Sequence, residues 1–422
     1  MTNEWLIAND IVNVAAGTYS DGEMTTASSR KYRVVVPAGV TLLGAGADKT
    51  IIEGAEDREN GTEAGHWCGP NALACVKLYA GSIVRGVTLT KGHTPEWEAS
   101  NTENWGGAVQ ASGVAAYIVD CVISNNFAGR GAGLYGGTAV RCRLNGNGVR
   151  STGTDIMQGS AYNCTFGDLV DASQDSVYQG HQYVNCVFYG SGNVSHINSG
   201  TVTNIWNSIV LRKYPGTGVR LLNCAMIASS GYSYGDTSVT LTQAEMMLDE
   251  NYAPRKGSPL IDRGRNDLYA KFPAAVAEAL AKTDLAGNQR VYNGTIDIGA
   301  YEYDWRGDFA KRLKRSQVDV VTASAVVVTN GVRALTVPSD ASIEIDWRVK
   351  ADGQHTFYAV AEGEGSVSVT CDGVELSPTA DGLYTFIGTT GETRRIVVAC
   401  SDGASAVLRD FRDSSGLTIS FR

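Results

Sequence analysis

The chain has 422 residues, enough for two domains, and a formal net charge of −9 at pH 7. The acidic balance argues against nucleic acid as a partner, and a strongly anionic polysaccharide would need a local basic patch or a cation. No apolar run is long enough for a transmembrane helix, and the start at Met1–Trp5 lacks the charged and apolar regions of a signal peptide.

The N-terminal part predicts short strands separated by glycine-rich turns. Apolar runs occur at residues 11–14, 33–36, 40–43, 50–52, 76–78 and 83–89. Two irregular insertions, 55–73 and 92–107, interrupt this pattern and contain tryptophans, histidines and acids. We expect the insertions to be loops between coils of one repeating structure.

A repeat near the middle of the chain is the strongest signal. Segments such as Tyr162–Phe166 and Val184–Phe188 carry a central cysteine, and Ser208 takes that place once. The central positions, 121, 142, 164, 186, 208 and 224, are 21, 22, 22, 22 and 16 residues apart. A period of this size with alternating apolar residues predicts a right-handed parallel β-helix, whose coils stack like residues on like.

The alternation predicts which residues of each segment point inward. Three residues per segment are expected on the buried face: Val119, Cys121 and Ile123; Val140, Cys142 and Leu144; Tyr162, Cys164 and Phe166; and Val184, Cys186 and Phe188. The cysteines then act as small buried hydrophobic residues, since thiols spread along an axis suit neither a metal nor a bridge. Cys68 and Cys75, in an irregular stretch, are the best candidates for a disulfide.

The repeat is absent from the last third of the sequence, where other patterns replace it. Residues 266–282 form the one convincing helix, alanine-rich with apolar residues three and four apart. A basic stretch at 306–316 is predicted to be a linker. Strand-like runs about every ten residues, separated by Asp-Gly pairs, then predict an antiparallel β-sandwich over 317–422. The β-helix domain would therefore cover 1–305, with a C-terminal cap at about 255–305.

Several motifs resemble one family. Gly257–Gly264, Thr283–Arg290 and Asn293–Glu302 resemble the C-terminal cap of secreted bacterial pectate-lyase-like β-helix proteins with a choice-of-anchor Q region. Val14–Tyr19 and Leu42–Gly46 are similar to the opening coils of that family. The resemblance covers roughly residues 8–304 and implies the fold and an extracellular, glycan-related setting. It carries no fixed catalytic motif, so fold analogy alone does not give a function.

The cysteine spacing predicts where a site would lie, because residues at equal offsets from the cysteine stack on successive coils. Offsets of about 7 to 13 select a polar stripe: Arg130, Arg150, Asp155, Asp171, Gln174, Asp175, Asn193, His196 and Asn198. A further candidate group lies in the two insertions, where tryptophan faces could stack on sugars: Trp67, His93, Glu96, Trp97, Glu98 and Trp105. The tryptophans could equally cover the open end of a coil.

Three interpretations of the stripe remain open. In a polysaccharide lyase, Arg130, Arg150 and His196 would be catalytic, with Arg150 or His196 as the base. Asp155, Asp171 and Asp175 would bind Ca²⁺. In a glycoside hydrolase, two of these aspartates would act as acid and base. In a non-catalytic surface or adhesive protein, the stripe only keeps the β-helix soluble. The leading hypothesis is an extracellular lyase that acts on an acidic polysaccharide; the sequence predicts no oligomeric state.

Overall fold

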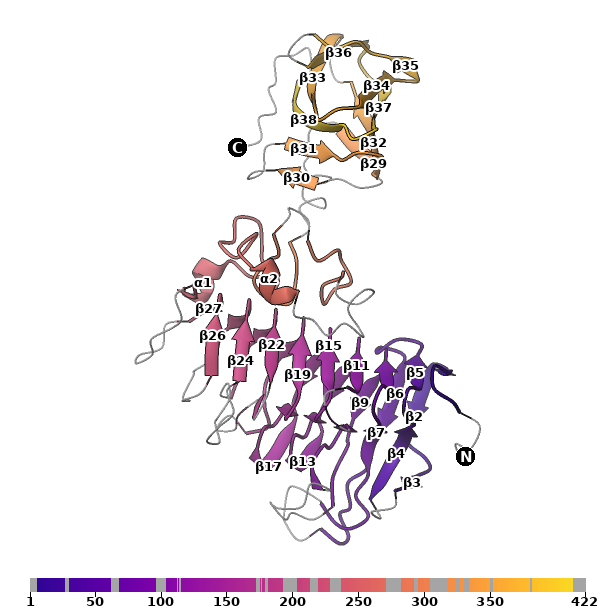
Figure 1. The fold of residues 1–422 in the computed structure, drawn as a ribbon, viewed down its shortest axis with the longest axis vertical. Helices are drawn as coiled ribbons and strands as arrows, with labels where there is room; N and C mark the ends of the chain where they lie inside the picture. The colour runs from indigo at the N-terminus through magenta and orange to yellow at the C-terminus, as the bar shows by residue number, and fades with distance from the viewer. Residues whose placement is uncertain are drawn as a thin grey trace. The chain divides into compact units, whose positions relative to one another are not determined.

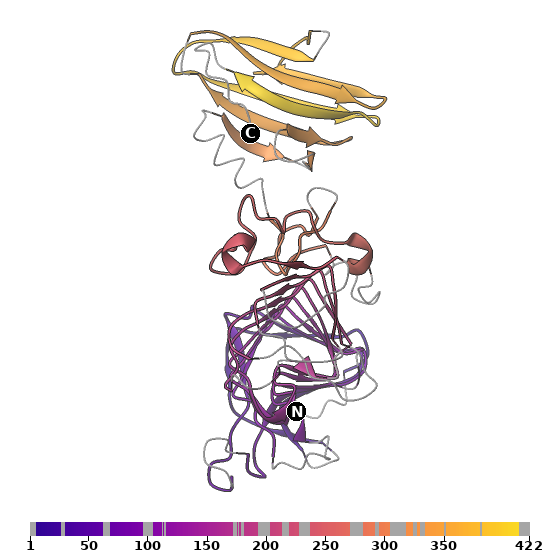
Figure 2. The same cartoon turned by 90° about the vertical axis from the view of Figure 1, so that its left-hand side faces the viewer.

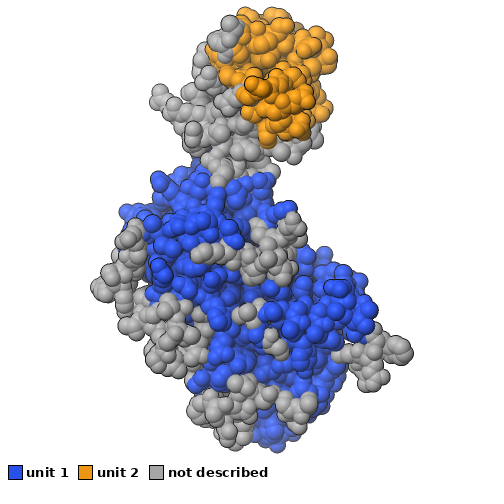
Figure 3. Space-filling view, in the orientation of Figure 1, with its two compact units in different colours: residues 1–291, 295–303 blue, residues 292–294, 304–422 orange. Residues whose placement is uncertain are grey.

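The computed structural model divides the chain into two compact units (Figure 3). Unit 1 comprises residues 1–291 and 295–303, and unit 2 comprises 292–294 and 304–422. The structure describes these residues: 6–26, 30–61, 68–95, 104–111, 113, 115–171, 175, 177–178, 181–192, 203–212, 219–227, 237–270, 282–291, 295–303, 318–323, 327–329, 334–349, 352–379 and 382–412. The predicted linker at 306–316 lies outside them. No helix in the described part is long and apolar enough to span a membrane.

Unit 1 is the predicted right-handed parallel β-helix, built from three long sheets, which we name A, B and C (Figures 1 and 2). Sheet A contains β1 (Ile11–Val14), β5 (Thr41–Gly44), β8 (Ile83–Arg85), β11 (Tyr117–Val119), β15 (Thr138–Val140), β19 (Ser160–Tyr162), β22 (Gln182–Val184), β24 (Thr203–Trp206) and β26 (Val219–Leu222). Each coil runs through sheet A, then B, then C, so neighbours in a sheet come from successive coils.

The other two sheets follow the same order of coils. Sheet B contains β2 (Gly17–Tyr19), β6 (Thr50–Glu53), β9 (Thr88–Thr90), β12 (Val122–Ser124), β16 (Arg143–Asn145), β20 (Thr165–Phe166), β23 (Val187–Phe188), β25 (Ile209–Val210), β27 (Ala225–Met226) and β28 (Val239–Thr240). Sheet C contains β3 (Met24–Thr25), β4 (Lys31–Val36), β7 (Ala74–Leu78), β10 (Val109–Ala111), β14 (Leu134–Tyr135), β18 (Ile156–Met157) and β21 (Val177–Tyr178). A two-stranded sheet, β13 (Phe127–Arg130) and β17 (Gly148–Thr152), lies in the connections from B to C.

The coils stack in register, so like residues meet inside. Phe166 and Phe188 are direct partners in sheet B, and their rings stack with centroids 4.5 Å apart. Aliphatic residues line the other two sheets at matching positions, as Ile118 and Ala139 do in sheet A. Stacking buries a continuous apolar interior that no single coil could bury alone.

The inward face is not the one that simple alternation predicts. Cys121 and Ile123 lie in the core as expected, but Val119 lies outside, and Ile118 takes the inward position of sheet A. The same correction applies to Val140, Tyr162 and Val184. The cause is the single residue before each cysteine, such as Asp120, whose φ of 53° bends the chain at a corner and shifts the alternation by one.

This corner between sheets A and B explains the recurring Asn-Cys pair. The residue before the cysteine, or before Ser208 in one coil, adopts the left-handed conformation in six coils, with φ between 49° and 55°: Asp120, Arg141, Asn163, Asn185, Asn207 and Asn223. Asparagine tolerates this conformation better than most other residues.

The thiols stabilise the same corner through hydrogen bonds. Cys164 Sγ donates to the Tyr162 carbonyl at 3.3 Å and accepts from the Cys142 backbone N–H at 3.3 Å. Ser208 reproduces both contacts, with its hydroxyl 2.7 Å from the Trp206 carbonyl and 3.0 Å from the Cys186 N–H. The position therefore needs a small side chain that both donates and accepts, which explains why serine can replace cysteine.

The predicted disulfide between Cys68 and Cys75 is wrong. Neither cysteine forms a disulfide. The Cys75 side chain is buried inside the β-helix, where its Sγ donates to the Thr90 carbonyl at 3.3 Å, and burial raises its pKa to about 12. Cys68 lies in the insertion, where its backbone pairs with Asp57.

The described part of the cap, residues 241–270, 282–291 and 295–303, packs on outward side chains of sheets A and B, at the corner between these sheets. It contains α1 (Gln243–Met246), which begins with a capping box from Thr242 and Glu245, and α2 (Asn266–Tyr269). The predicted helix at 266–282 is confirmed only for α2, since 271–281 lie outside the described residues. Leu268 of α2 packs on the outward residues of sheet A.

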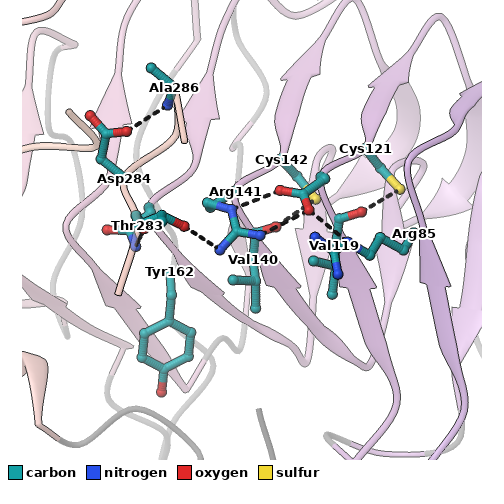
Figure 4. A network of polar contacts seen from close by, with 12 residues as sticks. Arg85, Val119, Cys121, Val140, Arg141, Cys142, Tyr162, Thr283, Asp284 and Ala286 are labelled. Atoms are coloured by element: carbon teal, nitrogen blue, oxygen red, sulfur yellow. Dashed lines mark hydrogen bonds and ion pairs between the residues drawn. The ribbon is translucent and has the colours of Figure 1, made fainter. Parts of the chain in front are cut away.

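Corner side chains bind the cap, as Arg141 does through its hydrogen bond to Thr283 (Figure 4). Asn185 Nδ2 donates to the Asp297 carbonyl at 2.8 Å, and Asn223 Nδ2 donates to the Arg263 carbonyl at 2.8 Å. On an earlier coil, Arg141 donates two hydrogen bonds to Asp120, at 2.7 and 2.8 Å, and a third to Thr283 Oγ1 at 2.9 Å. The corner residues thus turn the chain and hold the cap.

Unit 2 is the predicted antiparallel β-sandwich. One sheet contains β29 (Val318–Ala323), β32 (Ser342–Arg348), β37 (Thr393–Ser401), β34 (Ser366–Cys371) and β35 (Val374–Glu375). The other contains β30 (Val327–Thr329), β31 (Ala334–Val337), β38 (Ser405–Arg412), β33 (Gly353–Glu362) and β36 (Leu383–Gly388). Trp347, Phe357, Tyr384 and Phe386 fill the core between the two sheets.

We expect His355→Leu to stabilise the sandwich by about 1–3 kcal/mol. His355 is fully buried, neither ring nitrogen has a hydrogen-bond partner, and its ring stacks 5.2 Å from Phe386. Leucine removes the cost of burying an unpaired polar group. Calorimetry of the full chain should show the sandwich transition at higher temperature. A lower transition temperature would contradict this interpretation, and exposed His181→Leu, in unit 1, is the control.

Candidate functional site

The described residues of the cap pack on sheets A and B and leave sheet C to other segments, such as the one that contains Trp105. Cap residues such as Leu268 pack on sheet A, and others such as Ile298 pack on the last strands of sheet B. Among the described residues, none of these cap clusters includes a side chain of sheet C. The outer face of sheet C and the adjoining edge between B and C are therefore the candidate surface.

The outer face of sheet C carries one row of aligned side chains. Val34, Val76, Val109, Leu134 and Ile156 stack on each other, and most of these point into the core. The residues that follow them in each strand therefore point outward: Val35, Lys77, Gln110, Tyr135 and Met157. This row contains a cation, an amide and an aromatic ring, and no carboxylate.

Lys77 and Gln110 form the polar part of the row. Lys77 Nζ donates to Gln110 Oε1 at 2.7 Å and lies 5.6 Å from the ring centroid of Tyr79. The Tyr32 hydroxyl donates to the same Gln110 oxygen. Two donors on one oxygen fix the orientation of the amide, and the half-buried ammonium of Lys77 is held above the sheet.

Trp105 closes the row at its other end. It packs on Met157 and meets Tyr135 edge to face, with ring centroids 4.9 Å apart. Arg30, itself buried, fixes this tryptophan by donating to the Trp105 and Gly106 carbonyls at 2.6 and 2.8 Å. Trp105 therefore covers the side of the β-helix rather than the open end of a coil.

Arg130 and Arg150 lie on neighbouring strands at the edge between B and C. The guanidinium of Arg130 lies 5.0 Å from the centroid of Trp105, which joins this edge to sheet C. Strands β13 and β17 pair in parallel, but an irregularity places Arg130 opposite Thr152 rather than Arg150. Arg150 is exposed. The edge thus presents two guanidinium groups from successive coils.

The three aspartates predicted to bind Ca²⁺ occupy different environments. Asp155 is fully buried, and Asn147 Nδ2 donates to its Oδ1 at 2.9 Å. Asn147 in turn accepts from Asn126 Nδ2 at 3.0 Å, so Asp155 ends a polar ladder inside the β-helix. Asp171 is exposed and Asp175 is half-buried. Asp155 therefore does not fit a solvent-facing site, whereas Ca²⁺ binding at Asp171 and Asp175 stays a prediction.

Acidic groups converge elsewhere in the described part of the chain. The carboxylate oxygens of Asp262, Asp297 and Glu302 lie within 4.8 Å of one another in the cap. No other set of three or more histidine, cysteine or acidic side chains converges in this way among the described residues. Asp262 and Asp297 belong to the cap motifs Gly257–Gly264 and Asn293–Glu302, and their backbone hydrogen bonds within the cap are consistent with a structural role.

Several predicted site residues cannot be placed. Trp67, Glu96, Trp97, Gln174, His196 and Asn198 lie outside the described residues. His93 is half-buried; its ring lies 6.2 Å from that of Phe127, and its Nδ1 is 3.0 Å from the Lys91 carbonyl. It therefore lies at the start of the same edge as Arg130.

The sequence reasoning missed Arg30, Tyr32, Lys77 and Gln110. Their signal was present, since Lys77 sits between Val76 and Leu78, and Gln110 between Val109 and Ala111. A polar residue between two core positions of a strand faces outward. The cysteine spacing did not identify them, because offsets of 7 to 13 residues from each cysteine select the connection after sheet B and not sheet C itself.

Comparisons with known proteins found solved structures that match the chain at low sequence identity and with TM-scores below 0.5. No protein-family model and no curated protein matches the chain. Pectin methylesterase PemA from Erwinia chrysanthemi is 10% identical, with a TM-score of 0.34 over 56% of this chain and 85% of that one. A carrot pectin methylesterase is 14% identical, with a TM-score of 0.25 over 57% and 83%. The enzymatically active domain of bacteriophage CBA120 tailspike protein 4 is 12% identical, with a TM-score of 0.25 over 88% and 54%.

Proposed function

We propose that the protein binds an acidic polysaccharide outside the cell and cleaves it by β-elimination. The observation that carries this proposal is the set of half-buried side chains along sheet C and its edge, Lys77, Tyr135 and Arg130, which the buried Gln110 and Trp105 hold in place. In a chain of net charge −9, a local surface of cations, amides and aromatic rings suits a sugar chain that bears carboxylates.

The geometry supports a polymer that runs along the axis of the β-helix. Lys77 and Gln110 come from adjacent strands, about 4.8 Å apart, and Arg130 and Arg150 come from successive coils, so polar groups recur along the axis. Arginine binds a carboxylate through two parallel hydrogen bonds, whereas Lys77 acts as a point charge. The half-buried Tyr135 adds an aromatic ring beside these charges, and the buried Trp105 supports it from the side.

In the proposed reaction, a base removes the proton on C5 of a uronate, next to its carboxylate. The C4–O bond then breaks, a C4–C5 double bond forms, and the leaving oxygen takes up a proton. Arg130 and Lys77 would neutralise the carboxylate and so stabilise the negative charge that develops there. A guanidinium suits carboxylate binding and an imidazole suits proton transfer, so His196 is a better candidate for the base than Arg150.

Ca²⁺ at Asp171 and Asp175 would add positive charge near the substrate carboxylate. No step of the proposed reaction depends on it, because the two arginines and Lys77 already provide cations. We therefore expect cleavage to persist in a chelator. Loss of cleavage in chelator, restored by Ca²⁺, would assign that role to Asp171 and Asp175.

The hydrolase alternative has less support, since Asp155 is buried and bonded to Asn147. A glycan panel separates the alternatives. A lyase produces unsaturated uronate ends that absorb in the ultraviolet, a hydrolase produces new reducing ends without that absorbance, and a binding protein produces neither. The proposal predicts the absorbance gain on a polyuronate, and its absence on every acidic glycan would overturn it.

Lys77→Gln tests the surface itself. We expect roughly tenfold weaker binding of an acidic polysaccharide, because the substitution removes the one cation of the outward row. Isothermal calorimetry with sized oligouronates measures the change. Exposed Lys49→Gln, in the turn between sheets A and B, is the matched control. Equal binding by both variants would contradict the placement of the site.

A further inference from the structure

Two buried side chains at the start of β4 lie close to the proposed binding surface. Arg30 directly precedes β4, and Tyr32 is the second residue of this strand. The exposed fraction is 2% for Arg30 and 0% for Tyr32, so neither side chain can contact a polysaccharide. The Arg30 guanidinium lies 4.7 Å from the centroid of the Tyr32 ring, and the two side chains therefore pack as one unit.

Tyr32 reaches Lys77 through Gln110. Strand β7 lies between β4 and β10 in sheet C, and Tyr32 lies opposite Ala74 of β7. The small Ala74 lets the phenol ring cross β7, and its hydroxyl donates to Gln110 Oε1 on β10. Lys77 Nζ donates to the same oxygen at 2.7 Å. Gln110 is itself buried, so the amide that binds Lys77 is oriented from inside the protein.

Arg30 reaches Arg130 through the turn that carries Trp105. Arg30 donates to the Trp105 and Gly106 carbonyls at 2.6 and 2.8 Å. On the other side of this turn, the Gly106 N–H donates to the Arg130 carbonyl at 3.0 Å, and the Arg130 guanidinium lies 5.0 Å from the Trp105 ring centroid. The turn requires glycine, because the φ of Gly106 is 83° and a Cβ there would lie 2.4 Å from the Val109 carbonyl oxygen. Arg30 therefore fixes the ring on which Arg130 rests.

The two cations belong to different coils. Lys77 lies on β7 and Arg130 in the connection before β14, and β10 separates these two strands in sheet C. The strands are therefore two spacings apart, about 10 Å along the axis. A polysaccharide gains most from both cations when their relative position is fixed before binding, since less freedom is then lost. Arg30 and Tyr32 contact the support of each cation.

We propose that Arg30 and Tyr32 are positioning residues, which hold Arg130 and Lys77 in the arrangement that binds an acidic polysaccharide and do not touch the sugar themselves. The positioning role rests on the proposed function, but it predicts its own pattern of variants. A residue that acts through another loses its effect on binding once that other side chain is removed.

Tyr32→Phe tests the role of Tyr32. Phenylalanine keeps the buried ring and removes the hydroxyl that donates to Gln110, so an oligogalacturonate should bind about threefold more weakly in calorimetry. Tyr162→Phe is the matched control, since the buried Tyr162 donates from its hydroxyl to Gln182 Oε1 at 3.0 Å on sheet A. Both variants lose one hydrogen bond from tyrosine to glutamine and should lose similar thermal stability, but only Tyr32→Phe should weaken binding.

Two double variants separate positioning from a general loss of structure. In a Lys77→Gln background, Tyr32→Phe should have no further effect on binding. Arg30→Lys alone should weaken binding about threefold, and in an Arg130→Ala background it should have no effect. If Arg30→Lys does not fold, the Tyr32 variants still decide the question.

The outcomes distinguish the positioning role from the binding surface. If Tyr32→Phe binds like Tyr162→Phe, or weakens binding equally with and without Lys77, the positioning role is overturned even where Lys77→Gln weakens binding as expected. If Lys77→Gln and Arg130→Ala both leave binding unchanged, the proposed surface is wrong, and the positioning role fails with it.

Discussion

Cys164→Asp is expected to abolish the folded β-helix, whereas Cys164→Ser should cost only about 1 kcal/mol. The Cys164 side chain is fully buried between the thiols of the neighbouring coils. A carboxylate there would be an unpaired charge in an apolar interior, which costs several kcal/mol or more. A serine hydroxyl would make the same two contacts that Ser208 makes in its own coil.

Circular dichroism and calorimetry of the full chain measure this difference. The aspartate variant should lose the β-helix transition and retain that of the sandwich. Cys164→Val is the informative third variant: it keeps an apolar side chain but leaves the Cys142 N–H and the Tyr162 carbonyl without this partner. If serine were no better than valine, the thiol would serve only to fill space.

Arg130→Ala is expected to lower kcat/KM for cleavage of an acidic polysaccharide by about a hundredfold, if Arg130 stabilises charge on the substrate carboxylate. Arg130→Lys should recover part of this loss, because it restores the charge but not the planar fork. The rate of ultraviolet absorbance gain measures the effect. Arg220→Ala, which removes an exposed arginine of sheet A, is the matched control.

Melting temperature must accompany these rates, since Arg130 also lies over the ring of Trp105. A variant with unchanged rate and unchanged stability would remove Arg130 from the proposed mechanism. A loss of rate that follows a loss of stability, and that lysine does not relieve, would make Arg130 a support for Trp105 instead.

The fold was predictable because the same strand pattern recurs several times along the sequence. One strand such as Val184–Phe188 is ambiguous, but several copies at one spacing leave few architectures. Which residues of each strand point inward was not predictable from alternation alone. A single left-handed residue, such as Asn163 with a φ of 52°, moves Tyr162 from the inside to the outside.

The candidate site was predictable in part. The cysteine spacing identified the edge that carries Arg130 and Arg150, but it could not show that the side chain of Asp155 is buried inside the β-helix. Lys77 was missed because its partner Gln110 is 33 residues away, and only the stacking of coils brings them together. The capping box at Thr242 and Glu245 was readable from the sequence and was overlooked.

The central claim is that an acidic polysaccharide occupies the outer face of sheet C and the edge beside it. Hydrogen exchange with and without a saturating oligogalacturonate tests this most directly. The account predicts slower exchange in peptides covering β7, β10, β13 and β14, with no change in α2 or in β33 of the sandwich. Protection confined to the sandwich, or protection nowhere along sheet C, would contradict it.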